Sequence, residues 1–338
     1  MNLKCALTAV VVVISGCHAS FARGRSSIAF PQAGQVKQII QQDKTGWMIT
    51  GNQVLRSSKG GIDAVYSDPD GILDAARQGD ELYLATRKGL KRFTLGDQLT
   101  QGKTSFPNQE ISCLALDDKM RLWVGSMHQG AYVQAGPDSF ELKLQIPSIL
   151  SMAATPNDTN VWIGTNVGLY RLGTGAFSYT RYAEEGYSGY ELPDNVVEHV
   201  FADDLTNVWV LMPDNISFKK GSGFQGELPS FGFIGERGNA IHSILAVGKD
   251  WYLFVTEKGV SYMPVRALQD EHQHATEEVH EAHNTQSLQA KPAMLGCPQD
   301  WATEPVLRAQ KAGNQIWFVT AKGCWNVNEG KLSRSLKG

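Results

Sequence analysis

The stretch Asn160-Val-Trp-Ile-Gly-Thr-Asn-Val-Gly-Leu-Tyr-Arg171 decides the fold, because recognisable versions of it occur seven times along the chain. Each version places an aromatic residue within a short alternating apolar run. These aromatic positions are Trp47, Tyr83, Trp123, Trp162, Trp209, Tyr252 and Trp317. The first six are 36 to 47 residues apart, and a period of about 40 residues in a β-rich chain is typical of a propeller.

Each repeat has the same internal order. An apolar strand comes first, then a polar turn such as Asp117-Asp118-Lys119, the aromatic strand, and in several repeats a glycine that permits a tight hairpin. The first strands are expected at 36–41, 72–77, 111–116, 149–154, 197–202, 241–247 and 306–310. The sequence therefore predicts an all-β, seven-bladed β-propeller of four-stranded antiparallel blades over residues 27–336. Pairing of residues 27–30 with the C-terminal strand would close the ring.

The repeated residues have structural explanations. An aromatic residue at a fixed place in every repeat is expected to pack between neighbouring blades. The carboxylate pairs Asp117-Asp118 and Asp203-Asp204 occur at the same turn of two repeats, so we expect them to stabilise turns and not to catalyse. No Gly-x-Ser-x-Gly, phosphate-loop or His-Glu-x-x-His motif is present.

Composition narrows the class of protein. With 338 residues, 42% hydrophobic and 19% charged, the chain can bury a sizeable core, which excludes wholesale disorder. The formal net charge of −3 gives no electrostatic reason to expect nucleic acid as a partner.

The N-terminus predicts export. Residues 1–16 have a basic Lys4 and an apolar run at 6–14, as in a signal peptide, and Ile14-Ser-Gly-Cys17 resembles the bacterial lipobox, in which the cysteine is lipidated. Cys17 is thus the predicted lipidation site. The protein would be periplasmic and tethered to the membrane only through its lipid anchor. The alternative is cleavage after Ala22 and a soluble periplasmic or secreted protein.

Two cysteines outside the signal peptide are disulfide candidates. Cys297 and Cys324 flank the last aromatic strand, and an exported protein meets an oxidising compartment. The alternative is that these residues and Cys113 are small buried hydrophobic side chains.

An acidic, histidine-rich insertion at about 265–295 explains the longer gap before the last repeat. It contains His272, His274, His280 and His283. Histidine and glutamate bind zinc, copper or nickel, so a divalent metal is a hypothesis here. The competing interpretation is a solvated, disordered insertion, and no other cofactor is expected.

A second irregular segment contains Tyr187, Tyr190 and Glu191, before the fifth repeat. Its aromatic and polar side chains make it a candidate ligand-binding loop at a mouth of the propeller. A plain surface loop is the alternative.

Two stretches resemble the two-component-regulator propeller repeat, the ligand-binding sensor domain of bacterial hybrid histidine kinases. They are Trp162-Ile-Gly-Thr165 with Gly168-Leu169, and Leu192-Pro-Asp-Asn195 followed by Asp203 and Trp209. The resemblance is clearest in repeats three to five. It implies a propeller outside the inner membrane that senses a ligand, although no kinase or output segment is recognisable in this sequence.

The leading hypothesis is a non-enzymatic exported propeller that binds a small ligand or an envelope protein partner, as an accessory sensor or envelope lipoprotein. The alternatives are a lyase or hydrolase on the same scaffold, and an assembly scaffold of the cell envelope. An enzyme should bring Asp, Glu or His together at the central mouth with shifted pKa values. A binding module should show an aromatic or polar rim instead.

Overall fold

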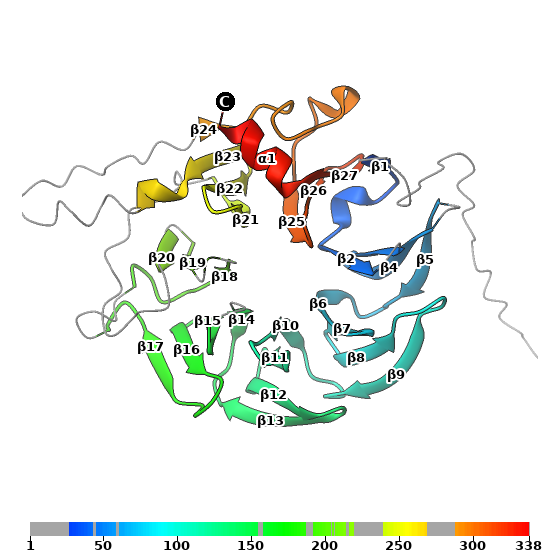
Figure 1. The fold of residues 1–338 in the computed structure, drawn as a ribbon. Coiled ribbons are helices and arrows are strands. Elements are labelled where there is room, and N and C mark those ends of the chain that lie inside the picture. Colours follow the sequence, from blue (N-terminus) through cyan, green and yellow to red (C-terminus); the bar gives the residue numbers. More distant parts are fainter. Residues whose placement is uncertain are drawn as a thin grey trace, which may run out of the picture.

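A computed structural model of the protein describes residues 27–42, 45–58, 61–154, 158–186, 192–203, 205, 207–213, 216–219, 239–268 and 288–337. These residues form seven antiparallel sheets that follow one another around a ring (Figure 1). The predicted seven-bladed β-propeller is confirmed. Within the described residues, no helix is long and apolar enough to cross a membrane.

The first strand of each blade is the innermost one, and later strands lie progressively outward (Figure 1). Blade one contains β2 (Gln38–Gln42), β3 (Thr45–Ile49), β4 (Gln53–Ser58) and β5 (Gly61–Ser67), and blade two contains β6 (Ile72–Gln78), β7 (Glu81–Thr86), β8 (Gly89–Thr94) and β9 (Thr100–Ser105). Blade three contains β10 (Ile111–Leu116), β11 (Leu122–Ser126), β12 (Gly130–Gly136) and β13 (Ser139–Leu144). Blade four contains β14 (Ile149–Ala154), β15 (Asn160–Thr165), β16 (Gly168–Gly173) and β17 (Tyr179–Tyr182). Blades five to seven are β18 (His199–Ala202), β19 (Val208–Leu211), β20 (Ile216–Lys219); β21 (Ile241–Val247), β22 (Trp251–Thr256), β23 (Gly259–Pro264), β24 (Leu288–Gln289); and β25 (Arg308–Ala312), β26 (Gln315–Val319), β27 (Gly323–Asn328), β1 (Ser27–Ala29). In the described part of blade five, three strands are present.

The ring closes as predicted, by pairing of its two ends. Strand β1 is antiparallel to β27, with Ser27 opposite Trp325 and Ala29 opposite Gly323. An added Cβ at Gly323 would collide with the carbonyl oxygen of Ile28, so the close approach of the two strands needs a glycine here. We call the junction of blades seven and one the seam.

The repeated aromatic residues pack between blades, as expected. Trp123 is fully buried in a cluster with Ile149 and Val161 of blade four, and Trp162 is fully buried with Val197 and Val208 around blade five. Burial of side chains this large is a main source of propeller stability.

Tyr252 is the exception, because the predicted repeat alignment is one residue out of register in blade six. Leu253, and not Tyr252, stands three residues before the strand-ending Thr256, where Trp162 stands relative to Thr165. Adjacent strand residues face opposite sides of a sheet. Tyr252 therefore packs back against Trp209 of blade five, with their ring centroids 5.0 Å apart.

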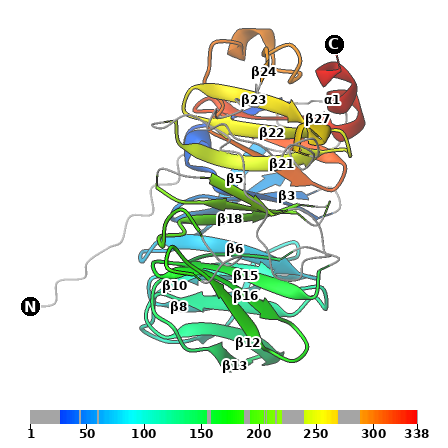
Figure 2. The ribbon, with the colours of Figure 1, turned by 90° about the vertical axis from the view of Figure 1, so that its left-hand side faces the viewer.

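The chain also contains short helical segments that the sequence analysis did not predict: η1 (Ala33–Gln35), η2 (Val265–Leu268), η4 (Gln299–Trp301) and α1 (Glu329–Leu336). Helix α1 follows β27 directly (Figure 2). The Asn328 side chain caps it by accepting from the Lys331 N–H, and Leu332 and Leu336 are buried between blades six and seven. The last predicted propeller residues are thus a helix that covers a blade junction.

The predicted disulfide is absent, since Cys297 and Cys324 are both free thiols. Cys324 lies in the cluster between blades seven and one, whereas its neighbour Trp325 and Cys297 belong to the cluster between blades six and seven. The sheet of blade seven separates the two sulfur atoms. Cys324 and Cys113 are buried, as the alternative of small buried hydrophobic side chains expects, whereas Cys297 is only partly buried.

Candidate functional site

The first strands of all seven blades line one cavity of about 590 Å³ along the propeller axis. We call it the axial channel. Its volume lies in the range of small-molecule sites, about 300–1,000 Å³.

One residue of each first strand occupies the same register position in the channel. These seven residues pair with Ile49, Ala85, Gly125, Gly164, Leu211, Val255 and Val319 of the second strands. We call them the channel ring: Gln38, Asp74, Cys113, Ser151, His199, Ser243 and Arg308.

Three members of the channel ring brace the next blade. A carboxylate oxygen of Asp74 accepts from the Leu114 N–H at 2.7 Å. The hydroxyls of Ser151 and Ser243 accept in the same way from the next first strand, each at 3.1 Å. Asp74 therefore has a structural role that a serine fulfils in two other blades.

Asp74 also carries the charge that its serine counterparts lack. Burial raises the pKa of this carboxyl to about 6, against hydrogen bonds from the Leu114 and Ala75 N–H groups and the nearby charges of Lys37 and Arg308. Among the described residues that line the channel, Asp74 is the one acidic side chain.

Two cations from the seam line the channel. Burial lowers the pKa of Lys37, and the neighbouring Arg308 charge lowers it further. Burial also lowers the pKa of Arg308, which Asp74 partly offsets. Both residues additionally line a second cavity of about 400 Å³ next to the axial channel, together with Gly34, Gln35, Val36, Gly51 and Leu307.

Two histidines enter the channel from blades five and six. Desolvation lowers the pKa of His199, Glu198 opposes this effect, and Arg308 and His242 add to it. The neutral form of His199 is thereby favoured. The His199 residue is exposed to solvent and lines the channel.

An acid and two histidines in one cavity meet the criterion stated above for an enzyme. In this structure Asp74, His199 and His242 are not linked to one another by hydrogen bonds. Both carboxylate oxygens of Asp74 accept from backbone N–H groups, and within the described residues His199 and His242 donate to no carboxylate. General acid–base catalysis requires a side chain within hydrogen-bond reach of the substrate, so these residues keep an enzyme as the alternative to a binding protein.

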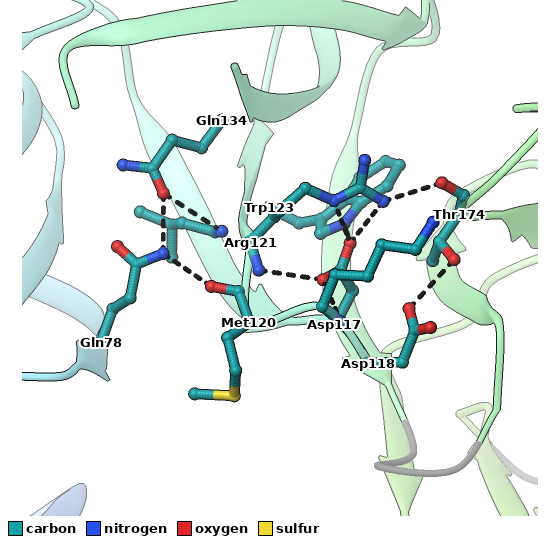
Figure 3. A network of polar contacts seen from close by, with 10 residues as sticks. Gln78, Asp117, Asp118, Met120, Arg121, Trp123, Gln134 and Thr174 are labelled. Atoms are coloured by element: carbon teal, nitrogen blue, oxygen red, sulfur yellow. Dashed lines mark hydrogen bonds and ion pairs between the residues drawn. The ribbon is translucent and has the colours of Figure 1, made fainter. Parts of the chain in front are cut away.

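The predicted turn carboxylates Asp117, Asp118 and Asp203 do not line the channel, whereas Asp204 lies outside the described residues; Figure 3 shows Asp117 and Asp118. Asp117 is buried and accepts from the Trp123 indole N–H at 2.9 Å and from the Arg121 Nε–H at 2.8 Å. Asp118 accepts from the Thr174 hydroxyl at 3.0 Å. In blade five, Asp203 accepts from the Leu205 and Asn207 N–H groups.

The remaining predicted site residues lie outside the described part of the chain: the lipidation site Cys17, the histidines His272, His274, His280 and His283, and the loop residues Tyr187, Tyr190 and Glu191. They stay predictions. Within the described residues, no group of three or more His, Cys, Asp or Glu could hold a metal ion.

The sequence analysis missed the channel residues Lys37, Asp74, His199, His242 and Arg308. A signal was present, because each is a polar residue at or near the start of a predicted first strand. The repeats were aligned on the aromatic residue of the second strand, so the polar residues of the first strands were not compared with one another.

Comparisons place the fold among known propellers. No protein-family model and no curated protein matches the sequence. The structure resembles the extracellular domain of a putative hybrid two-component system from B. thetaiotaomicron, with a TM-score of 0.60 and 16% identity over 90% of this chain; the chain covers only 40% of that protein. It also resembles a catalytically inactive virginiamycin B lyase from Staphylococcus aureus with quinupristin, with a TM-score of 0.58, 12% identity, and coverage of 89% of this chain and 98% of the lyase. For YCF48 from Cyanidioschyzon merolae the TM-score is 0.58, with 11% identity and coverage of 92% and 99%. At these identities the likeness establishes the propeller fold, and the first neighbour agrees with the resemblance to sensor propellers.

Proposed function

We propose that this protein is an exported, non-enzymatic β-propeller that binds a small ligand in its axial channel, in a sensing or accessory role in the cell envelope. The channel itself carries this proposal. Seven first strands converge on one cavity of ligand size, and its lining residues Asp74, Ser151 and Ser243 are held by hydrogen bonds from backbone N–H groups.

Export is supported by the signal-peptide-like N-terminus with Cys17 in a lipobox-like motif. The extracellular sensor neighbour is consistent with it. Whether the mature protein is lipid-anchored is tested by mass spectrometry of the membrane fraction, with Cys17→Ala as the control. The lipoprotein proposal predicts acylated peptide and loss of membrane association in the variant.

A plug in the channel tests the binding proposal. Leu150 lines the channel and is partly exposed there, so Leu150→Trp should narrow it. Compounds from a metabolite library that raise the melting temperature of the wild type should lose most of that effect in the variant, because stabilisation follows occupancy of the folded state.

The matched control is Leu142→Trp. Leu142 is 43% exposed on β13, the outermost strand of blade three, so the same change is made far from the axis. Ligands should stabilise this variant as they stabilise the wild type. Equal responses of Leu150→Trp and Leu142→Trp would contradict binding in the channel.

Lyase or hydrolase activity is the second candidate, because Asp74, His199 and His242 share the channel and a lyase is among the structural neighbours. The test is incubation with quinupristin, followed by mass spectrometry, for the wild type and a His199→Ala/His242→Ala double variant. The binding proposal predicts no conversion by either protein. Conversion that the double variant loses would establish the enzyme instead.

A further inference from the structure

The axial channel has an excess of positive charge on its seam side. Lys37 and Arg308 come from adjacent blades and line both the channel and the neighbouring cavity. A third cation, Lys311, is paired with Glu329 of helix α1 at 3.0 Å. Opposite charge comes from Asp74 alone among the described lining residues.

Neither seam cation has a carboxylate partner in the described part of the chain. The Lys37 ammonium donates to the Ile72 carbonyl oxygen at 2.9 Å, which is a neutral acceptor. The Arg308 guanidinium makes no hydrogen bond and no ion pair with any described residue. Asp74 lies near both, but its two oxygens accept from the Ala75 and Leu114 N–H groups.

Two other partly buried cations are paired with carboxylates, whereas Arg56 and Arg77 donate to backbone carbonyl oxygens. The Lys91 ammonium, 14% exposed, lies 2.7 Å from a carboxylate oxygen of Asp68, and the Arg121 guanidinium lies 2.7 Å from Asp117. Desolvated charges are costly unless an opposite charge or hydrogen bonds compensate them. Within the described residues Arg308 has neither kind of partner, and an anionic ligand would supply the compensation that its site lacks.

Arg308 is well placed to hold a ligand. Its charge influences the pKa values of Lys37, Asp74 and His199, which belong to blades one, two and five. Arg308 lines the channel together with these three residues. A guanidinium presents two parallel N–H groups that match the geometry of a carboxylate or phosphoryl group, and an ammonium adds a point charge.

We propose that Lys37 and Arg308 bind the oxyanion group of a small ligand, a carboxylate or a phosphoryl group, whose apolar body lies in the channel against Leu73, Leu150 and Phe201. This inference rests on the proposed function and specifies the class of ligand. These three lining residues are apolar, whereas the seam residues Lys37 and Arg308 are charged. The channel is therefore suited to a molecule with one charged end.

Three aromatic probes of similar shape test whether the channel binds an oxyanion group. Benzoate and phenylphosphate carry the two forms of the group on the same ring, and benzamide is the neutral counterpart. Isothermal titration calorimetry on the purified protein should show saturable binding of at least one anion, with benzamide about tenfold weaker or worse. The preferred anion distinguishes a carboxylate from a phosphoryl site.

Arg308→Gln and Lys37→Gln should each weaken anion binding about tenfold or more. Glutamine is the residue that blade one carries at the position of Arg308, so the first change copies a side chain that the ring already accommodates. Asp74→Ser should strengthen anion binding, because it removes the negative charge and keeps a hydroxyl acceptor. Lys119→Gln, which removes one exposed cation from a turn of blade three, should change nothing.

The inference is overturned if neither anion binds saturably, if benzamide binds as well as benzoate, or if Arg308→Gln leaves anion affinity unchanged. Its failure can be told apart from failure of the proposed function. A ligand that Leu150→Trp blocks and Arg308→Gln does not would keep the channel as the site and refute the oxyanion.

Discussion

Blades three and four differ from the seam, and the difference separates the residues that build the blades from the residues that give the channel its charge. In blades three and four the second strands keep Trp-x-Gly, and their channel-ring residues are the small, neutral Cys113 and Ser151. At the seam the same glycine position is Ile49 or Val319, and the channel ring carries Gln38 and Arg308. The repeat is clearest where it builds the fold and weakest where the channel has its charge.

The glycines of the regular blades show what the repeat requires. A Cβ on Gly125 would lie 2.6 Å from the Cys113 sulfur, and one on Gly164 would lie 2.7 Å from a Val197 methyl group. Tight packing between neighbouring blades excludes a side chain at these positions. The seam tolerates Ile and Val there because its packing differs, so the two regions should respond differently to substitution.

The largest expected effect is in the regular blades. Trp123→Ala should lower the free energy of unfolding by about 3–5 kcal/mol, because it empties a fully buried inter-blade site. It also removes the indole N–H that donates to the buried Asp117. Chemical denaturation measures the change, and Tyr179→Ala, at a side chain that is 58% exposed, should stay near wild type. A loss below 1 kcal/mol, the usual range of surface changes, would refute inter-blade packing as the role of the tryptophan.

The second effect concerns the boundary between the two regions, at Asp74. Burial raises the pKa of Asp74 from 3.8 to about 6, so the folded state binds this proton more tightly than the unfolded chain does. The resulting stability is fully present below pH 3.8 and is lost as the pH rises through about 6. The pKa difference corresponds to at most about 3 kcal/mol.

Asp74→Ser isolates this contribution, because serine fulfils the same bracing role in blades four and six. Urea unfolding at several pH values should show that the stability of the wild type relative to the variant falls between about pH 4 and pH 6. Parallel pH profiles of the two proteins would mean that Asp74 titrates normally and is not desolvated by its surroundings.

The same contrast between the regular blades and the seam explains which features of the protein the sequence predicts. The fold was predictable because the repeated Trp, Gly and turn Asp residues each answer a local requirement of a blade, and first strands such as β10 and β14 occupy the expected ranges. The alignment failed in blade six, where Tyr252 imitates the repeat one residue early. The channel could not be predicted from the repeat, since Asp74, His199 and Arg308 are far apart in sequence and become neighbours only when the ring closes.

The smallest expected effects on stability compare two residues of the channel ring, one in a regular blade and one at the seam. Ser151→Ala removes the acceptor of the Val200 N–H and should lower the free energy of unfolding by about 1–3 kcal/mol, because a buried backbone donor loses its partner. Arg308→Gln at the same ring position should not lower the free energy of unfolding, since the guanidinium bonds to no described residue and its removal relieves an uncompensated charge. Denaturation in buffer without added anions measures both variants. A large loss of unfolding free energy in Arg308→Gln would show that Arg308 is a structural residue. The seam would then resemble the other blade junctions and would not be a ligand-binding site.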